Sequence, residues 1–136
     1  SWQLVDYVGV DDVGTVINPL LLDGQMHGGI AQGLGQARLE HAIYDPDTAQ
    51  PLAASFLDYA MPRADDLCEL RRDNRPVPSS ANSLGVKGAG ELGTVAASPT
   101  VISALLDALA PLGVTRLDMP ATPQAVWRAI QQARAG

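Results

Sequence analysis

Residues 23–41 read DGQMHGGIAQGLGQARLEH, and this stretch decides how the rest of the chain can be arranged. Met26 and Ile30 recur at helical spacing, so the pattern predicts a helix from Asp23, as N-cap, to about His41. Five glycines interrupt it, and each costs about 1 kcal/mol of helix stability relative to alanine. Either another backbone or a bound ligand must therefore approach the helix too closely for a side chain. The glycines are Gly24, Gly28, Gly29, Gly33 and Gly35.

The segments around this helix predict short strands. β-Branched and aromatic residues favour a strand at about 3–10. The segment LCELRRD is interpreted as a further strand at about 67–73, and AIYD as a short strand at 42–45. The segment 55–63 predicts a short helix or turn, because Pro62 cannot continue a helix.

Two further helices are predicted toward the C-terminus. Ser98 as N-cap, with Pro99 in the first position, predicts a helix that Gly113 ends. Thr122 and Pro123 give the same signal for a final helix. Short strands and helices without regular alternation indicate the α+β class, and the length of 136 residues suits a single domain spanning 1–136. The final helix is expected to face inward with Val126, Trp127 and Ile130.

The composition disfavours several classes of function. A net charge of −6 argues against nucleic acid, because phosphate binding needs clustered lysine and arginine. No run of about 18 apolar residues is evident, so no membrane span is expected. His27 and His41 lack a metal-ligand spacing, so no metal ligand is predicted. Cys68 is the only cysteine and cannot form an internal disulfide, so it is expected to pack in the interior.

A second glycine-rich segment, residues 83–94 (SLGVKGAGELGT), places the only lysine, Lys87, and Glu91 among four glycines. Its backbone N–H groups can converge on an anion, and a carboxylate held beside a bound group can act as a general base. The plainer interpretation is a surface turn with an exposed Glu91. A GxGxxG match begins at Gly88, but no strand precedes it and the predicted helix starts only at Ser98. A dinucleotide site is therefore the weakest alternative.

The order of several stretches resembles the molybdenum hydroxylases. They are VDDVGTVINPLLLDGQMHGGIAQGLGQARLEHAIYD (10–45), SFLDYAMPRADDL (55–67), and GVKGAGELGTVAASPTVISALLDAL (85–109) followed by LDMPATPQAVWRAI (117–130). This resemblance is to the molybdopterin-binding large subunit of the xanthine dehydrogenase, aldehyde oxidase and aerobic carbon monoxide dehydrogenase family, and it covers almost the whole chain.

The resemblance implies roles for particular residues. In this family the glutamate of the GxGE motif lies next to the molybdenum and is the general base, which corresponds to Glu91. The Gly-Gln pair that opens the glycine-rich helix contacts the cofactor, which places Gly24 and Gln25 there. The loop residues implied to line the pterin side are Lys87, Gly88, Ala89 and Gly90.

The resemblance also implies cofactors and partners. Molybdopterin, in the cytosine dinucleotide form, would carry the molybdenum, and electrons would leave through [2Fe–2S] clusters and FAD on partner subunits. The substrate would be a small molecule and the compartment the cytoplasm. Because the family's large subunit is several times longer, we expect a C-terminal part that needs its N-terminal remainder and is inactive alone. The alternatives are a non-catalytic remnant domain acting in binding or assembly, and a nucleotide-binding module.

Overall fold

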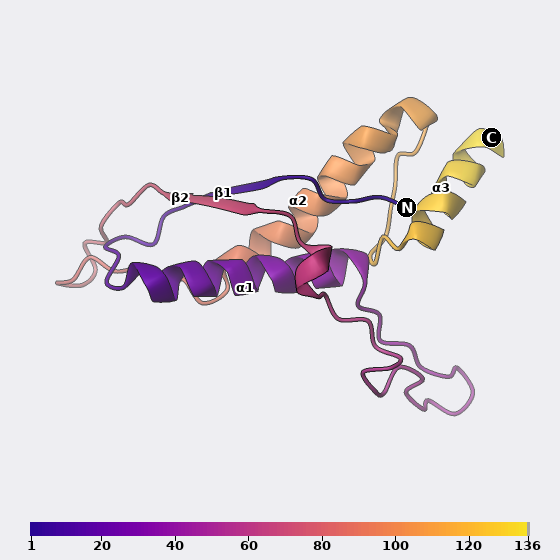
Figure 1. The fold of residues 1–136 in the computed structure, drawn as a ribbon, viewed down its shortest axis with the longest axis horizontal. Helices are drawn as coiled ribbons and strands as arrows, with labels where there is room; N and C mark the ends of the chain where they lie inside the picture. The colour runs from indigo at the N-terminus through magenta and orange to yellow at the C-terminus, as the bar shows by residue number, and fades with distance from the viewer. Residues whose placement is uncertain (136) are drawn as a thin grey trace.

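The computed structural model describes residues 1–135, and a long helix, α1 (Pro19–Arg38), runs through its centre (Figure 1). Two strands, β1 (Tyr7–Asp11) and β2 (Leu70–Asn74), lie above α1 in Figure 1. α2 (Leu92–Leu109) packs against α1 and diverges from it, and α3 (Pro123–Ala135) closes the far end. Single 3₁₀ turns occupy Ala64–Asp66 and Ala110–Leu112. Helices mixed with a small sheet confirm the predicted α+β class.

The two strands form a parallel sheet in which Gly9 pairs with Arg72. One face of the sheet packs on the helices, where Tyr7 is buried with Ile30 of α1 and Ala97 of α2. Both strands overlap the ranges that the sequence predicts. The third predicted strand, within 42–45, is wrong, because that segment contributes only an isolated bridge, between Tyr44 and Pro51.

α1 begins earlier than the sequence predicts. The Asn18 side chain accepts a hydrogen bond from the backbone N–H of Leu21 at 3.1 Å, and Pro19 takes the first turn, where its missing N–H is not needed. The prediction of Asp23 as N-cap is therefore wrong. Asp23 lies inside the helix, and its carboxylate forms an ion pair with Arg72 of β2.

α2 begins directly after the glycine-rich loop, at Leu92, so the prediction of Ser98 as its N-cap is also wrong. The Ser98 hydroxyl donates to the Gly33 carbonyl oxygen of α1 at 2.9 Å instead of capping its own helix. Pro99 lies on the exposed side of the same helix, within its span. Packing against α1 stabilises the helical residues that precede Ser98, and this outweighs the preference of serine for the N-cap position.

Glycines allow α1 and α2 to touch backbone to backbone. A Cβ on Gly33 would lie 2.5 Å from the Cβ of Ala97, and one on Gly93 would lie 2.7 Å from a backbone carbonyl oxygen of α1. Gly29 would meet the backbone nitrogen of Thr94 at 3.0 Å. Tight helix packing, one of the two alternatives for the glycine-rich helix, therefore explains part of its glycine content.

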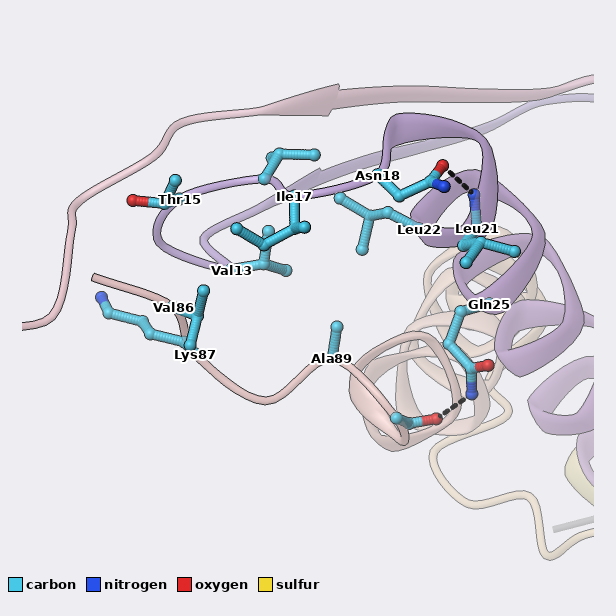
Figure 2. Close-up of a pocket in the computed structure, with 12 residues that line it drawn as sticks. Val13, Thr15, Ile17, Asn18, Leu21, Leu22, Gln25, Val86, Lys87 and Ala89 are labelled. Carbon is cyan, nitrogen blue, oxygen red and sulfur yellow. Dashed lines mark hydrogen bonds between the residues drawn. The ribbon is translucent and has the colours of Figure 1, made fainter. Parts of the chain in front are cut away.

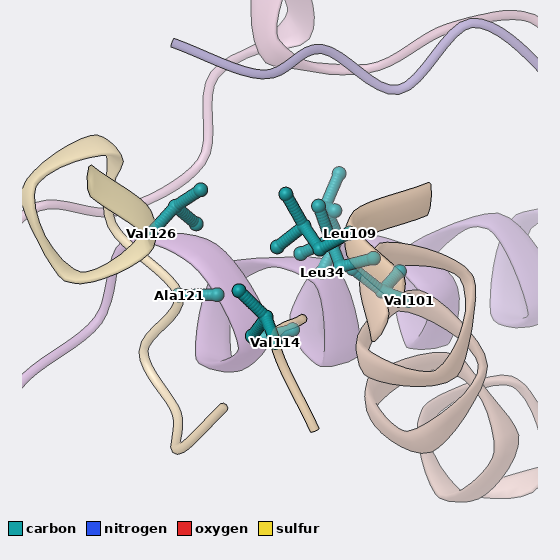
Figure 3. Close-up of a cluster of buried hydrophobic side chains, with 8 residues drawn as sticks. Leu34, Val101, Leu109, Val114, Ala121 and Val126 are labelled. Carbon is teal, nitrogen blue, oxygen red and sulfur yellow. The ribbon is translucent and has the colours of Figure 1, made fainter. Parts of the chain in front are cut away.

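A hydrophobic cluster fills the space where α2 diverges from α1 (Figure 3). It combines side chains from α1, α2, α3 and the chain between α2 and α3, which binds the C-terminal third to the rest. Its buried members are Leu34, Ala37, Val101, Leu105, Leu109, Val114, Ala121 and Val126.

α3 starts where the sequence predicts. The Thr122 hydroxyl oxygen accepts a hydrogen bond from the Ala125 backbone N–H at 3.1 Å. Val126 is buried and Ile130 is partly buried, as expected. Trp127 is 60% exposed, so the prediction that it faces inward is wrong.

One helix changes the expectation about membrane spans. Leu92–Leu112, which joins α2 to the following turn, has a mean hydropathy of 1.6 and is long and apolar enough to cross a membrane, by length and composition only. The sequence-based statement that no such run exists is therefore corrected. The helix packs along α1 and contributes Val101, Leu105 and Leu109 to the cluster in Figure 3, so part of its apolar character serves the core.

Candidate functional site

The glycine-rich helix and the glycine-rich loop meet at one hydrogen bond. Gln25 Nε2 donates to the Gly90 carbonyl oxygen at 2.6 Å, although the two residues are 65 positions apart. Four residues further along each segment, the Thr94 hydroxyl donates to the Gly29 carbonyl oxygen at 2.7 Å. The fold thus brings together the two segments that the sequence predicted to share a ligand.

A pocket of about 470 Å³ opens beside this bond (Figure 2). Its walls are mostly apolar, with polar groups from Thr15, Asn18, Gln25 and Lys87 around the opening, which is the usual character of a site for an organic ligand. The apolar walls include Val13, Val16, Ile17, Leu21 and Leu22. Four of the predicted site residues also line it: Gln25, Lys87, Ala89 and Gly90.

Asp12 holds the start of the glycine-rich loop. Its carboxylate forms an ion pair with Lys87 and accepts hydrogen bonds from the backbone N–H groups of Gly14, at 2.9 Å, and Val77, at 3.0 Å. Lys87, followed by these two N–H groups, lowers the pKa of Asp12 to about 2. The charge of Lys87 is therefore already matched within the chain, and Figure 2 shows its amine pointing away from Ala89 and Gln25.

Four glycines of the two glycine-rich segments leave their backbone open. A Cβ on Gly24, Gly28, Gly88 or Gly90 would find no atom of residues 1–135 within 4 Å. In α1 such glycines lower helix stability without allowing a close contact in return. Tight helix packing therefore does not explain these positions, and the alternative that the sequence left open for them is close approach of a ligand. Gly24 and Gly88 therefore border the pocket-lining residues Gln25 and Ala89 without filling any space.

Glu91 lies at the N-cap of α2 with an exposed side chain. This side chain makes no capping hydrogen bond with the part of the chain that the structure describes. The first turn of α2 therefore keeps uncapped N–H groups, which favour negative charge. Glu91 does not line the apolar pocket; it lines a second pocket of about 620 Å³ together with Gln32, Gln36 and Thr94. The hydrogen-bonded Gly90 joins the two pockets along the chain.

The remaining candidates are structural. Within residues 1–135, no group of three or more His, Cys, Asp or Glu side chains could hold a metal ion. Cys68 is partly buried against Tyr7 and Leu70 and is not in a disulfide, as expected for a packing residue. Burial raises the pKa of its thiol, which makes it a weak nucleophile.

The GxGxxG match needs one correction. α2 follows the loop directly, so the expectation that its helix starts only at Ser98 is wrong. The segment before the loop is not a strand, however, because Val86 forms only an isolated bridge with Gly14. The strand–turn–helix unit of a dinucleotide site is therefore incomplete here.

Sequence reasoning missed the hydroxyl groups that align the two helices. Thr94 and Ser98 are four residues apart and bond to Gly29 and Gly33, which are also four residues apart. Matched spacing of this kind, with small residues on one helix and hydroxyls on the other, is a signal that could have indicated the contact.

Comparison with known proteins shows the family of the chain. Residues 1–68 match a family described as the molybdopterin cofactor-binding domain. The chain is 39% identical over 120 residues to the nicotine 6-hydroxylase large subunit of Paenarthrobacter nicotinovorans, and 35% identical over 126 residues to the carbon monoxide dehydrogenase large chain of Hydrogenophaga pseudoflava. Among solved structures, quinoline 2-oxidoreductase from Pseudomonas putida 86 superimposes with a TM-score of 0.91 at 39% identity.

These alignments cover 88%, 93% and 96% of this chain, but only 15%, 16% and 16% of the respective relatives. The fold and the matches together define a segment of a molybdenum-cofactor-binding domain. The chain belongs to the molybdopterin-binding large-subunit family of the molybdenum hydroxylases, which confirms the resemblance seen in its sequence.

Proposed function

We propose that this chain supplies one side of the molybdopterin site and the general base, Glu91, of a molybdenum hydroxylase. The observation that supports the proposal most directly is the hydrogen bond from Gln25 to Gly90, because it joins both glycine-rich segments at one pocket. When bound, the molybdenum–pterin group supplies the two-electron oxidation of the substrate carbon.

The residues of this chain fit such a group. Gly24, Gly28, Gly88 and Gly90 leave backbone open to a bulky ligand. Gln25 uses its amide nitrogen on Gly90, so its amide oxygen can accept a hydrogen bond from an N–H of a heterocycle.

Glu91 is proposed to accept a proton from the water-derived nucleophile as it attacks the substrate carbon. A carboxylate suits this role, because it can take up a proton and return it to solvent within each turnover. Glu91 follows a loop that is held at both ends. Asp12 holds the loop at Lys87, and Gln25 holds it at Gly90, so the movement of the base is limited.

The chain spans 15–16% of the length of the relatives compared above, so we infer that the rest of the large subunit closes the site. We further infer that the pterin carries a cytosine nucleotide and that electrons leave through [2Fe–2S] clusters and FAD on partner subunits. One relative is named as subunit gamma of a 6-hydroxypseudooxynicotine dehydrogenase complex, which supports a multi-subunit assembly. The isolated chain is expected to be inactive, the substrate is expected to be a small molecule, and the cytoplasm is the expected compartment.

Glu91→Gln in the complete large subunit tests the proposed base. The substitution keeps size and hydrogen bonding but removes the basic carboxylate, so turnover should fall by at least about 100-fold. Molybdenum and pterin content should stay normal. Glu69→Gln, at an exposed glutamate away from both pockets, is the matched control. A Glu91→Gln enzyme with near-normal turnover would overturn the assignment.

A further inference from the structure

The pocket beside Glu91 contains a line of polar groups that the proposed function does not use. Thr94, one turn after Glu91, lies with its hydroxyl oxygen 3.4 Å from Gln32 Oε1. Gln32 and Gln36 follow one helical turn apart on α1, about 6 Å along its axis, and Glu40 lies just beyond the end of the helix. All of them line the same pocket of about 620 Å³, which has room for about 20 water molecules.

Glu40 is held in this pocket by the backbone just beyond α1. The N–H groups of Leu39 and Glu40 both donate to the Gly35 carbonyl oxygen at 2.8 Å, which turns the chain back over the helix. A Cβ on Gly35 would lie 2.4 Å from Glu40 Oε1 and 2.8 Å from a ring carbon of Pro62. The missing side chain of Gly35 is therefore what allows the Glu40 carboxylate to lie against α1.

Tyr59 fixes the other oxygen of the same carboxylate. Its hydroxyl donates to Glu40 Oε2 at 2.9 Å, and this hydrogen bond raises the pKa of the tyrosine. The other charged groups near Tyr59 line a neighbouring pocket and not this one. They are Asp58, Arg63, Asp65 and Asp66.

We propose that Glu40, held by Tyr59, receives through water the proton that Glu91 takes up in each turnover and passes it to solvent. The inference rests on the proposed function of Glu91. The two carboxylates line the same pocket together with the polar side chains of Thr94, Gln32 and Gln36, and water filling this pocket would allow stepwise proton movement between them. The hydrogen bond from Tyr59 and the space left by Gly35 fix the Glu40 carboxylate at the wall of this pocket.

The chemistry balances with the reaction that the family relation supplies. Substrate R–H and water give R–OH, two protons and two electrons, and the electrons leave to the partner redox groups. Glu91 carries one of the protons, and its carboxylate must be regenerated before the next turnover. The O–H bond formed on Glu91 breaks toward a pocket water, a proton reaches the Glu40 carboxylate, and the same carboxylate releases a proton to bulk water.

Glu40→Gln in the complete, cofactor-loaded enzyme tests the relay. Glutamine keeps an acceptor for Tyr59 but cannot carry the proton. Steady-state turnover should fall at least about tenfold, while reduction of the enzyme in a single turnover keeps its rate. Proton release, followed with an indicator dye, should lag behind reduction. Added imidazole or formate buffer should restore turnover, because a small acid–base pair can replace the missing carboxylate.

Two further variants keep this test interpretable. Tyr59→Phe removes the bond to Glu40 and should give a smaller loss of the same kind, and Asp65→Asn, at an exposed carboxylate outside this pocket, should match the wild-type enzyme. Unchanged steady-state turnover in Glu40→Gln would overturn the relay. A rise in KM, or a slower single turnover that buffer does not restore, would also overturn the relay, because either result would assign the pocket to substrate binding. An active Glu91→Gln enzyme would show that Glu91 is not the base, and this result is separate from any result for Glu40.

Discussion

Replacing Gly33 by alanine tests how closely α1 and α2 pack. The new Cβ would lie 2.5 Å from the Cβ of Ala97, 3.1 Å from the Thr94 carbonyl oxygen and 3.2 Å from the Ser98 nitrogen. None of these atoms can rotate away, so the helices must separate. Overpacking costs about 1–3 kcal/mol, and a carbon–carbon approach of 2.5 Å belongs in the upper part of that range, at about 2–3 kcal/mol, whereas alanine returns about 1 kcal/mol of helix propensity. We expect a net loss in the free energy of unfolding of about 1–2 kcal/mol.

Gly28→Ala is the matched control on the same helix. Its Cβ would meet no atom of residues 1–135 within 4 Å, so only the propensity gain of about 1 kcal/mol remains. Urea unfolding of the 136-residue chain, followed by circular dichroism, compares the two. The two variants should differ by about 2–3 kcal/mol, so with a slope of about 1–2 kcal/mol per molar urea their midpoints should differ by roughly 1–3 M, on opposite sides of the wild-type value. Shifts of both variants in the same direction would refute the account of the glycine-rich helix.

Three further predictions concern single contacts. Because the folded-state pKa of Asp12 is lowered to about 2 from 3.8, the stability from its ion pair with Lys87 is present above pH 3.8 and is lost as the pH falls toward 2. Asp12→Asn should therefore flatten the pH dependence of the urea midpoint between these values, and an unchanged profile would contradict the pairing. Thr122→Ala removes the cap of α3 and should cost about 1 kcal/mol in the same assay, whereas Thr122→Ser should cost little. Cys68 should react with a thiol reagent more slowly than a cysteine in a short peptide at pH 8, since burial raises its pKa, and equal rates would argue against its packing.

The sequence predicts several elements well where local chemistry decides them. Thr122 with Pro123 marks the start of α3, and the strand-forming residues of 3–10 locate β1 to within a few positions. β2 also lies within a few positions of the predicted 67–73. The α+β class follows from these elements and the long glycine-rich helix. The glycine-rich helix was also recognisable as exceptional in the sequence, because so many glycines in one helix lower its stability.

Other features depend on contacts between distant parts of the chain. Ser98 carries a good cap signal, but its hydroxyl bonds to Gly33, 65 residues away, and the helix extends past it to Leu92. The pairing of Asp12 with Lys87 likewise joins segments 75 residues apart. Nor could the pattern separate the glycines that let helices touch from those that leave backbone open, because both kinds occur in the same few turns of α1.

Cofactor content of the complete large subunit carrying Gly90→Val tests the central claim most directly. A Cβ at Gly90 meets no atom of residues 1–135 within 4 Å, so the new side chain starts into open space, and urea unfolding of the 136-residue chain should change little. If the open backbone at this position accommodates the pterin, the complete subunit should fold but lose most of its molybdenum and pterin. Full cofactor content in that variant would contradict the claim that the glycine-rich loop forms one side of the cofactor site.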